Sequence, residues 1–106
     1  MVAEHGLTEL AASIATRAGE LARVRRSIRA PDAVPLLQAD AGDAASLAAL
    51  VKQAQVVIST VGPYQWHGEA LVRACAEAGT DYVDLCGEPG WMAEMIQRHT
   101  AAARAS

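Results

Sequence analysis

The sequence contains no phenylalanine, and aromatic residues make up only 4% of its 106 residues. Two cysteines, Cys75 and Cys86, are too few for a disulfide scaffold and favour a reducing compartment. No apolar run approaches the roughly 18 residues of a membrane span. The first ten residues hold two acidic residues and no apolar block, so no signal peptide is visible. These absences predict a cytoplasmic protein without a membrane span.

Positive charge is also scarce, with 9 Lys and Arg against 12 Asp and Glu and a formal net charge of −3. This acidic balance argues against a nucleic-acid binder. Hydrophobic residues make up 52% of the chain and charged residues 20%, which excludes an intrinsically disordered chain. The length then allows one small domain or a part of one.

Short β-branched runs alternate with amphipathic segments along the chain. The pattern predicts strands over residues 11–16, 34–39, 55–61 and 81–85, and helices over residues 18–29, 44–54, 69–79 and 91–105. Asp43 is the expected N-cap of the second helix, and Gly79 the expected end of the third. Such alternation predicts an α/β fold: a Rossmann-like parallel sheet with helices on both faces.

Ligands of open parallel sheets bind at the carboxyl ends of the strands. The residues expected there are Arg17, Asp40, the turn Gly62-Pro63-Tyr64 and the segment 84–88. The glycine-rich turn of dinucleotide-binding folds is missing, because the eight glycines are scattered and form no G-x-G-x-x-G. Without that turn the sequence offers no pyrophosphate cradle at a helix N-terminus.

Several motifs in order resemble the saccharopine dehydrogenase-like NAD(P)-binding family, most closely its trans-acting enoyl reductase branch. They are Gly62-Pro63-Tyr64, Gly68, Ala74-Cys75, Ala78-Gly79, Tyr82-Val83-Asp84 and Gly87-Glu88. The resemblance implies NADP as cofactor in the full-length parent, with hydride transfer to an enoyl or related lipid-pathway substrate. A small molecule or acyl group would then be the partner.

Each candidate cofactor residue also has a structural interpretation. Arg17 would meet the 2′-phosphate of NADP, or be a solvated arginine at a helix start. Asp40 would contact adenine, or end a strand and cap the following turn. Gly62 and Pro63 would let the backbone approach the nicotinamide half, or form a rigid turn beside Tyr64.

Other reactive residues carry weaker signals. A proton-transfer role for His67 lacks an evident partner carboxylate, which favours a polar loop residue. Cys86 is a candidate reactive thiol at a strand end, whereas Cys75 fits a small core residue. Asp84 and Glu88 are two carboxylates at the site edge that would shape a substrate pocket. No spacing predicts a metal site.

The resemblance covers an internal part of the family's Rossmann domain, so residues 1–106 are expected to be a truncated domain. Residues 1–5 would end the first helix, the first glycine-rich strand would precede Met1, and a catalytic and dimerisation domain would follow. Losing the central first strand leaves a slot between residues 11–16 and 56–61. We predict that these two segments pair directly, because unpaired backbone groups are costly. The alternative is an open slot.

Two functions follow. The first is part of an NAD(P)-dependent oxidoreductase, in which the chain alone binds cofactor weakly or not at all and is inactive. The second is a non-catalytic α/β interaction module, or a pseudogene product, that binds a partner through its exposed sheet edge and the helix containing Trp91. That edge is also where a homo-oligomer would form.

Overall fold

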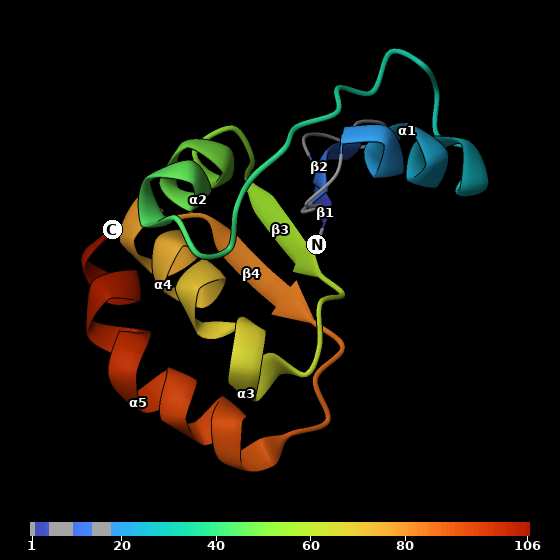
Figure 1. Cartoon of the computed structure of the whole chain (residues 1–106). Coiled ribbons are helices and arrows are strands. Elements are labelled where there is room, and N and C mark those ends of the chain that lie inside the picture. The colour runs from blue at the N-terminus through green and yellow to red at the C-terminus, as the bar shows by residue number, and fades with distance from the viewer. Residues whose placement is uncertain (1, 5–9, 14–17) are drawn as a thin grey trace.

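The computed structural model describes residues 2–4, 10–13 and 18–106, with side chains described from Leu21 onward (Figure 1). Its elements in chain order are β1 (Val2–Glu4), β2 (Leu10–Ser13), α1 (Ala18–Ser27), α2 (Ala44–Val51), β3 (Val56–Ser59), α3 (Tyr64–His67), α4 (Glu69–Ala78), β4 (Asp81–Asp84) and α5 (Pro89–Ala105). This arrangement confirms an α/β fold of Rossmann-like type, in which β3 and β4 form the parallel part of the sheet. None of the helices in the described ranges is long and apolar enough to cross a membrane.

The four predicted helices are present as α1, α2, α4 and α5, and their caps explain where they begin and end. The Asp43 carboxylate accepts the backbone N–H groups of Ala45 at 3.0 Å and Ser46 at 3.4 Å, which confirms it as the N-cap of α2. Gly79 ends α4 with a φ of 73°, a left-handed conformation that glycine adopts without strain.

The short helix α3 was not predicted. Pro63 precedes it with extended backbone angles, and Gly68 separates it from α4. A Cβ atom at Gly68 would lie 2.6 Å from Cζ2 of Trp91 and 2.8 Å from the carbonyl oxygen of Tyr64. A glycine is therefore required for α3 to pack closely against the start of α5.

The sheet has the order β2-β1-β3-β4, which corrects two predictions. Residues Val2–Glu4 form a strand rather than a helix end, and they lie antiparallel between β2 and β3, with Val2 opposite both Ser13 and Ile58. The predicted direct pairing of residues 11–16 with 56–61 is wrong, and so is the open slot. β1 supplies the backbone donors and acceptors that both flanking strands need.

The strand predicted over residues 34–39 is also wrong, because this segment has no regular secondary structure. Pro35 has no backbone N–H to give to a ladder. The carbonyl oxygen of Val34 accepts instead from the Arg25 guanidinium at 3.2 Å. Buried Val34 and Ala39 still anchor the segment, so its apolar pattern reflects burial without strand pairing.

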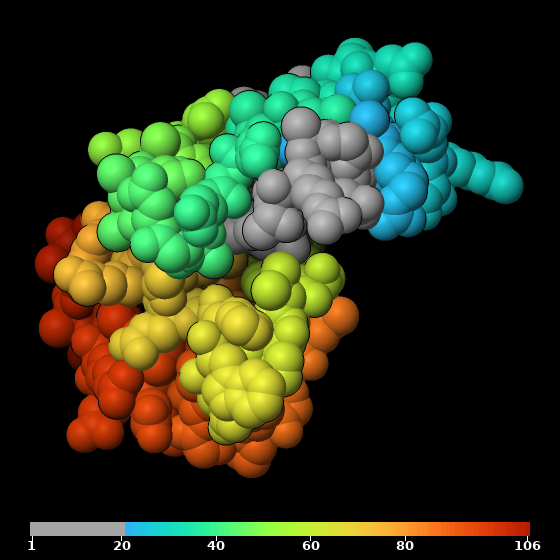
Figure 2. Space-filling model, in the orientation of Figure 1, coloured from blue at the N-terminus to red at the C-terminus, as the bar shows by residue number. Residues whose placement is uncertain are grey.

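The core has two clusters of buried residues. The aliphatic cluster joins α2, α4 and β3 and consists of Ala39, Leu47, Leu50, Val51, Val57, Leu71 and Cys75. The aromatic cluster joins α3 and α5 and consists of Tyr64, Trp91 and Met95, with Val72 and Cys86 packed against it. In Figures 1 and 2, α2, α4 and α5 lie beside one another and form a continuous helical surface.

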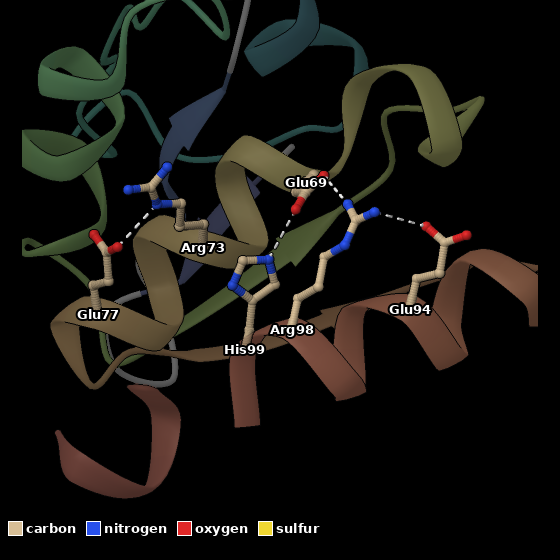
Figure 3. A network of polar contacts seen from close by, with 6 residues as sticks. All are labelled: Glu69, Arg73, Glu77, Glu94, Arg98 and His99. Carbon is tan, nitrogen blue, oxygen red and sulfur yellow. Dashed lines mark hydrogen bonds and ion pairs between the residues drawn. The ribbon is translucent and has the colours of Figure 1, made fainter. Parts of the chain in front are cut away.

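An ion-pair network joins α4 to α5 outside the core (Figure 3). Glu69 of α4 pairs with Arg98 at 2.9 Å and with His99 Nε2 at 3.2 Å, and Arg98 also pairs with Glu94 at 3.5 Å. Desolvation raises the pKa of Glu69, but the hydrogen bonds and charges of Arg98 and His99 outweigh it, so the net pKa is lowered.

Candidate nucleotide site at the carboxyl edge of the sheet

Two parallel strands end together at one edge of the sheet. β3 and β4 pair in register, with Ser59 opposite Asp84. The chain segments that follow them, residues 60–63 and 85–88, therefore start side by side. This edge is the place where parallel α/β sheets bind ligands.

The Tyr64 side chain links the ends of β3 and β4. Tyr64 is 7% exposed, and the centroid of its ring lies 5.6 Å from that of the Trp91 ring. The Tyr64 hydroxyl donates to the Ser59 carbonyl oxygen at 3.0 Å and accepts from the Leu85 N–H at 3.4 Å. The side chain is therefore part of the support of the edge, and a direct contact of Tyr64 with cofactor stays a prediction.

Gly62 and Pro63 lie at the surface of this edge. A Cβ atom at Gly62 would make an ordinary 3.5 Å contact with the Tyr64 ring. Pro63 is the N-cap residue of α3 and makes no side-chain cap bond. The structure thus gives both residues the exposed turn that the sequence predicts, while their contact with a cofactor stays a prediction.

Glu88 is the residue whose role the sequence did not reveal. Its Oε2 accepts the Tyr64 N–H at 2.9 Å, and its Oε1 accepts the Gln65 N–H at 3.2 Å. The carboxylate thereby caps α3 from a loop 24 residues away in sequence. The signal available in the sequence was the Gly87-Glu88 motif, which does not indicate this partner.

Asp84 and Glu88 do not act as a carboxylate pair, because each has its own donors. Asp84 Oδ2 accepts from the Tyr82 hydroxyl at 2.7 Å, and Asp84 Oδ1 accepts from the Cys86 N–H at 2.9 Å. Burial, and then the bond to Asp84, raises the pKa of Tyr82. The arrangement fixes the end of β4 and leaves Tyr82 protonated at neutral pH.

Cys86 is half-buried, with its sulfur 3.7 Å from Glu88 Oε2. Desolvation raises the pKa of this thiol, and the charges of Glu88 and Asp84 raise it further against a lowering backbone hydrogen bond from Glu88. A protonated thiol is a poor nucleophile, so these surroundings do not activate Cys86. The His67 ring, in α3, lies edge-on to the ring of its neighbour Trp66, with the ring centroids 6.4 Å apart.

Of the other two predicted cofactor residues, Asp40 and Arg17, the structure describes only Asp40. Asp40 is exposed in the turn before α2, where its Oδ1 accepts the Gly42 N–H at 2.8 Å and its own N–H donates to Ser46 Oγ at 3.0 Å. Asp40 therefore caps the turn as its structural interpretation expects, but the strand that it was expected to end is absent from this segment. Its contact with adenine stays a prediction. Arg17 lies outside the described residues.

The sequence of the chain matches a known protein family over almost its whole length. A profile of the saccharopine dehydrogenase NADP binding domain matches residues 2–106. The chain belongs to this family. The match confirms the resemblance carried by the Gly-Pro-Tyr and Gly-Glu motifs, and NADP is the cofactor of the family's domain.

Individual relatives of this NADP-binding domain are much longer than the chain. It is 43% identical to a trans-acting enoyl reductase of Mycobacterium leprae over 111 aligned positions, which cover 100% of the chain and 27% of that protein. It is 49% identical over 78 residues to a trans-acting enoyl reductase of Mycobacterium tuberculosis, covering 72% of the chain and 19% of the relative. A lipid droplet localized protein of Caenorhabditis elegans is 44% identical over 69 residues, covering 65% and 16%. No solved structure matches the chain significantly.

The backbone amides at the start of α3 limit which ligand groups this edge can bind. The exposed Gly62-Pro63 turn follows the end of β3 and leads into these amides. The first amides of α3 are already bonded to Glu88, so they are not available to a phosphate. Which part of a cofactor the turn would contact stays a prediction.

Proposed function

We propose that the chain is part of the NADP-binding domain of an oxidoreductase similar to trans-acting enoyl reductases. The observation that carries the proposal is the family match together with the joined loops at the carboxyl ends of β3 and β4. When bound, the cofactor supplies hydride chemistry, and the protein supplies binding and orientation. An enoyl group of a lipid-pathway molecule is the proposed substrate, by analogy with the names of the mycobacterial relatives.

In this proposal the residues of the chain have distinct tasks. Gly62 and Pro63 face the cofactor. Tyr64 and Glu88 hold this turn in place through their hydrogen bonds. Arg17 is proposed to select NADP by pairing with its 2′-phosphate. Residues 1–106 then form part of a dinucleotide-binding domain, and reduction of a substrate requires a separate catalytic part.

The test is a titration of the isotope-labelled chain with NADPH, followed by NMR. We expect localised, saturable shift changes at Gly62 and at the loop after β4, with a Kd weaker than about 1 mM, equivalent to about −4 kcal/mol. Arg17→Ala should weaken NADPH binding more than NADH binding, because a charge-assisted contact to phosphate is lost. Equal losses would remove Arg17 from the site, and the absence of localised shifts would contradict the proposal.

A second candidate function is an interaction module that pairs with another copy of the chain. β4 is an edge strand, because β3 is its one neighbour in the sheet of the described residues. Apolar side chains are exposed on β4, on the loop after it and on α5: Val83 is 49% exposed, Leu85 77% and Ile96 67%. A groove of about 450 Å³ lies between β4, α4 and α5. Sedimentation tests this: association that rises with concentration and is abolished by Val83→Lys supports it, and a monomer at all concentrations opposes it.

A further inference from the structure

We propose that Glu88 is a positioning residue at the carboxyl edge of the sheet, where the cofactor is proposed to bind. Its carboxylate holds the Gly62-Pro63-Tyr64 turn against the loop that follows β4. The inference deepens the proposed function and rests on it. Glu88 does not need to touch the cofactor. It acts through the backbone of the turn that would face the cofactor.

The first argument is the geometry of the carboxylate. Both of its oxygens are used, one on the Tyr64 N–H at 2.9 Å and the other on the Gln65 N–H at 3.2 Å. Two bonds to successive amides fix both the orientation of the turn and its distance from the loop that contains Glu88. Since Pro63 provides no side-chain cap for α3, Glu88 supplies the acceptor that these amides need.

The second argument is that Glu88 is itself held in place. Its backbone N–H donates to the sulfur of Cys86 at 3.2 Å, and the Cys86 N–H donates to Asp84 Oδ1 at 2.9 Å. The Glu88 carbonyl oxygen accepts the Met92 N–H at 3.0 Å, at the start of α5. The backbone of Glu88 is thus held by hydrogen bonds to residues on both sides of it in the chain. Glu88 therefore keeps its position and can fix the turn.

The third argument is a second connection on the other side of the turn. The Tyr64 hydroxyl bonds to the Ser59 carbonyl oxygen and to the Leu85 N–H. The backbone of Tyr64 is therefore held by Glu88 while its side chain is held by both strand ends. Residues 60–63 are confined between these two connections, which couples the position of Gly62 to the β4 loop.

The charge of Glu88 also affects what the edge accepts. A carboxylate at the start of α3 occupies the amides that would otherwise favour an anion there. We therefore expect the pyrophosphate to stay away from α3, and an uncharged group to lie on the Gly62-Pro63 turn. A variant without this carboxylate would lose that discrimination.

The experiment compares Glu88→Gln and Glu88→Ala with the unchanged chain. Glu94→Gln is the matched control, because Glu94 lies in the second turn of α5 and pairs with Arg98 on the outer face. In the isotope-labelled chain, we expect amide exchange at Tyr64 and Gln65 to rise by about tenfold or more in Glu88→Ala, since about 1.4 kcal/mol corresponds to tenfold. Glu88→Gln, which keeps one acceptor oxygen, should show a smaller rise, and Glu94→Gln none.

The chemical shift changes that NADPH induces are the second measurement. They would not change if the role of Glu88 were only structural. We expect Glu88→Ala to lose the shifts at Gly62 while amide exchange in α2 and β3 stays as in the unchanged chain. Glu88→Gln keeps the test valid if Glu88→Ala does not fold. Unchanged exchange at Tyr64 and Gln65 would overturn the inference. Persistent NADPH shifts in Glu88→Ala would overturn it while leaving the proposed function intact, whereas no shifts in the unchanged chain would overturn both.

Discussion

The two core clusters of this protein are built from different residues and serve different ends. The aliphatic cluster of α2, α4 and β3 contains small and branched side chains, and its members Leu47, Val51 and Val57 are fully buried. The aromatic cluster contains Tyr64, Trp91 and Met95, and its tyrosine has a polar group that reaches the strand ends. Burial alone stabilises the first cluster, whereas the second connects burial to the position of the site. The following predictions test that division.

The largest contrast is expected between the two cysteines, because Cys75 lies in the aliphatic cluster and Cys86 borders the aromatic one. Burial raises the pKa of Cys75 to about 12, so it should react with a thiol reagent only when the chain unfolds. With a stability of about 5 kcal/mol or more, that protection exceeds a thousandfold. Cys86 is partly accessible and should react in the folded protein, more slowly than a free cysteine.

Mass spectrometry of the modified chain after timed labelling measures both rates. Addition of urea is the control, since both thiols should then react at the same rate. Rapid modification of Cys75 in the folded chain would show that the aliphatic cluster opens locally.

Leu47→Ala should cost about 2–5 kcal/mol, because Leu47 is 0% exposed at the centre of the aliphatic cluster. The loss should shift the urea midpoint of unfolding without changing amide exchange at Tyr64 and Gln65 relative to the rest of the chain. Ala49→Ser, at an exposed position of the same helix, is the control and should have little effect. A selective change at the site loops would mean that the clusters are not independent.

Gly68→Ala should cost about 1–3 kcal/mol, because its added Cβ would overlap Trp91 and the Tyr64 carbonyl oxygen in the aromatic cluster. Gly90→Ala is the matched control: it lies in the first turn of α5, and an added Cβ meets no atom within 4 Å. Thermal unfolding measures both. We expect Gly68→Ala also to alter the Trp91 environment in fluorescence, and an unchanged midpoint would contradict the close packing.

The smallest effect is expected in acid, at the ion pairs that join α4 to α5 outside both clusters. The pKa of Glu69 is lowered from its ordinary value of 4.5, so its ionised form stabilises the fold above that value. The contribution should disappear as the pH falls below about 4.5 through the pKa in the folded state. Glu69→Gln should show less acid destabilisation than the unchanged chain in urea titrations between neutral and acid pH.

Glu77→Gln is the control for this pH dependence, because Glu77 pairs at 2.9 Å with Arg73 within α4 alone (Figure 3). It should leave the contact between α4 and α5 unchanged. If both variants alter acid stability equally, the effect comes from general charge and not from the pairing of the two helices.

The sequence by itself determined the four longer helices, the parallel pair β3–β4 and the edge where a ligand would bind. These features depend on local causes: the period of apolar residues, the Asp43 cap, the Gly79 end and the break at Gly62-Pro63. The family motifs also identified the NADP-binding domain, because they lie at consecutive turns along the chain.

Only the tertiary structure decided which segments pair and which side chains hold the site. The place of β1 between β2 and β3 depends on hydrogen bonds that distant strands need, and the irregular course of residues 34–39 depends on a bond from Arg25. The bond from Tyr64 to Glu88 spans 24 residues, and no local periodicity reports such a partner. Contacts between residues far apart in sequence are set by packing in three dimensions, which is why the supports of the site appear only in the folded chain.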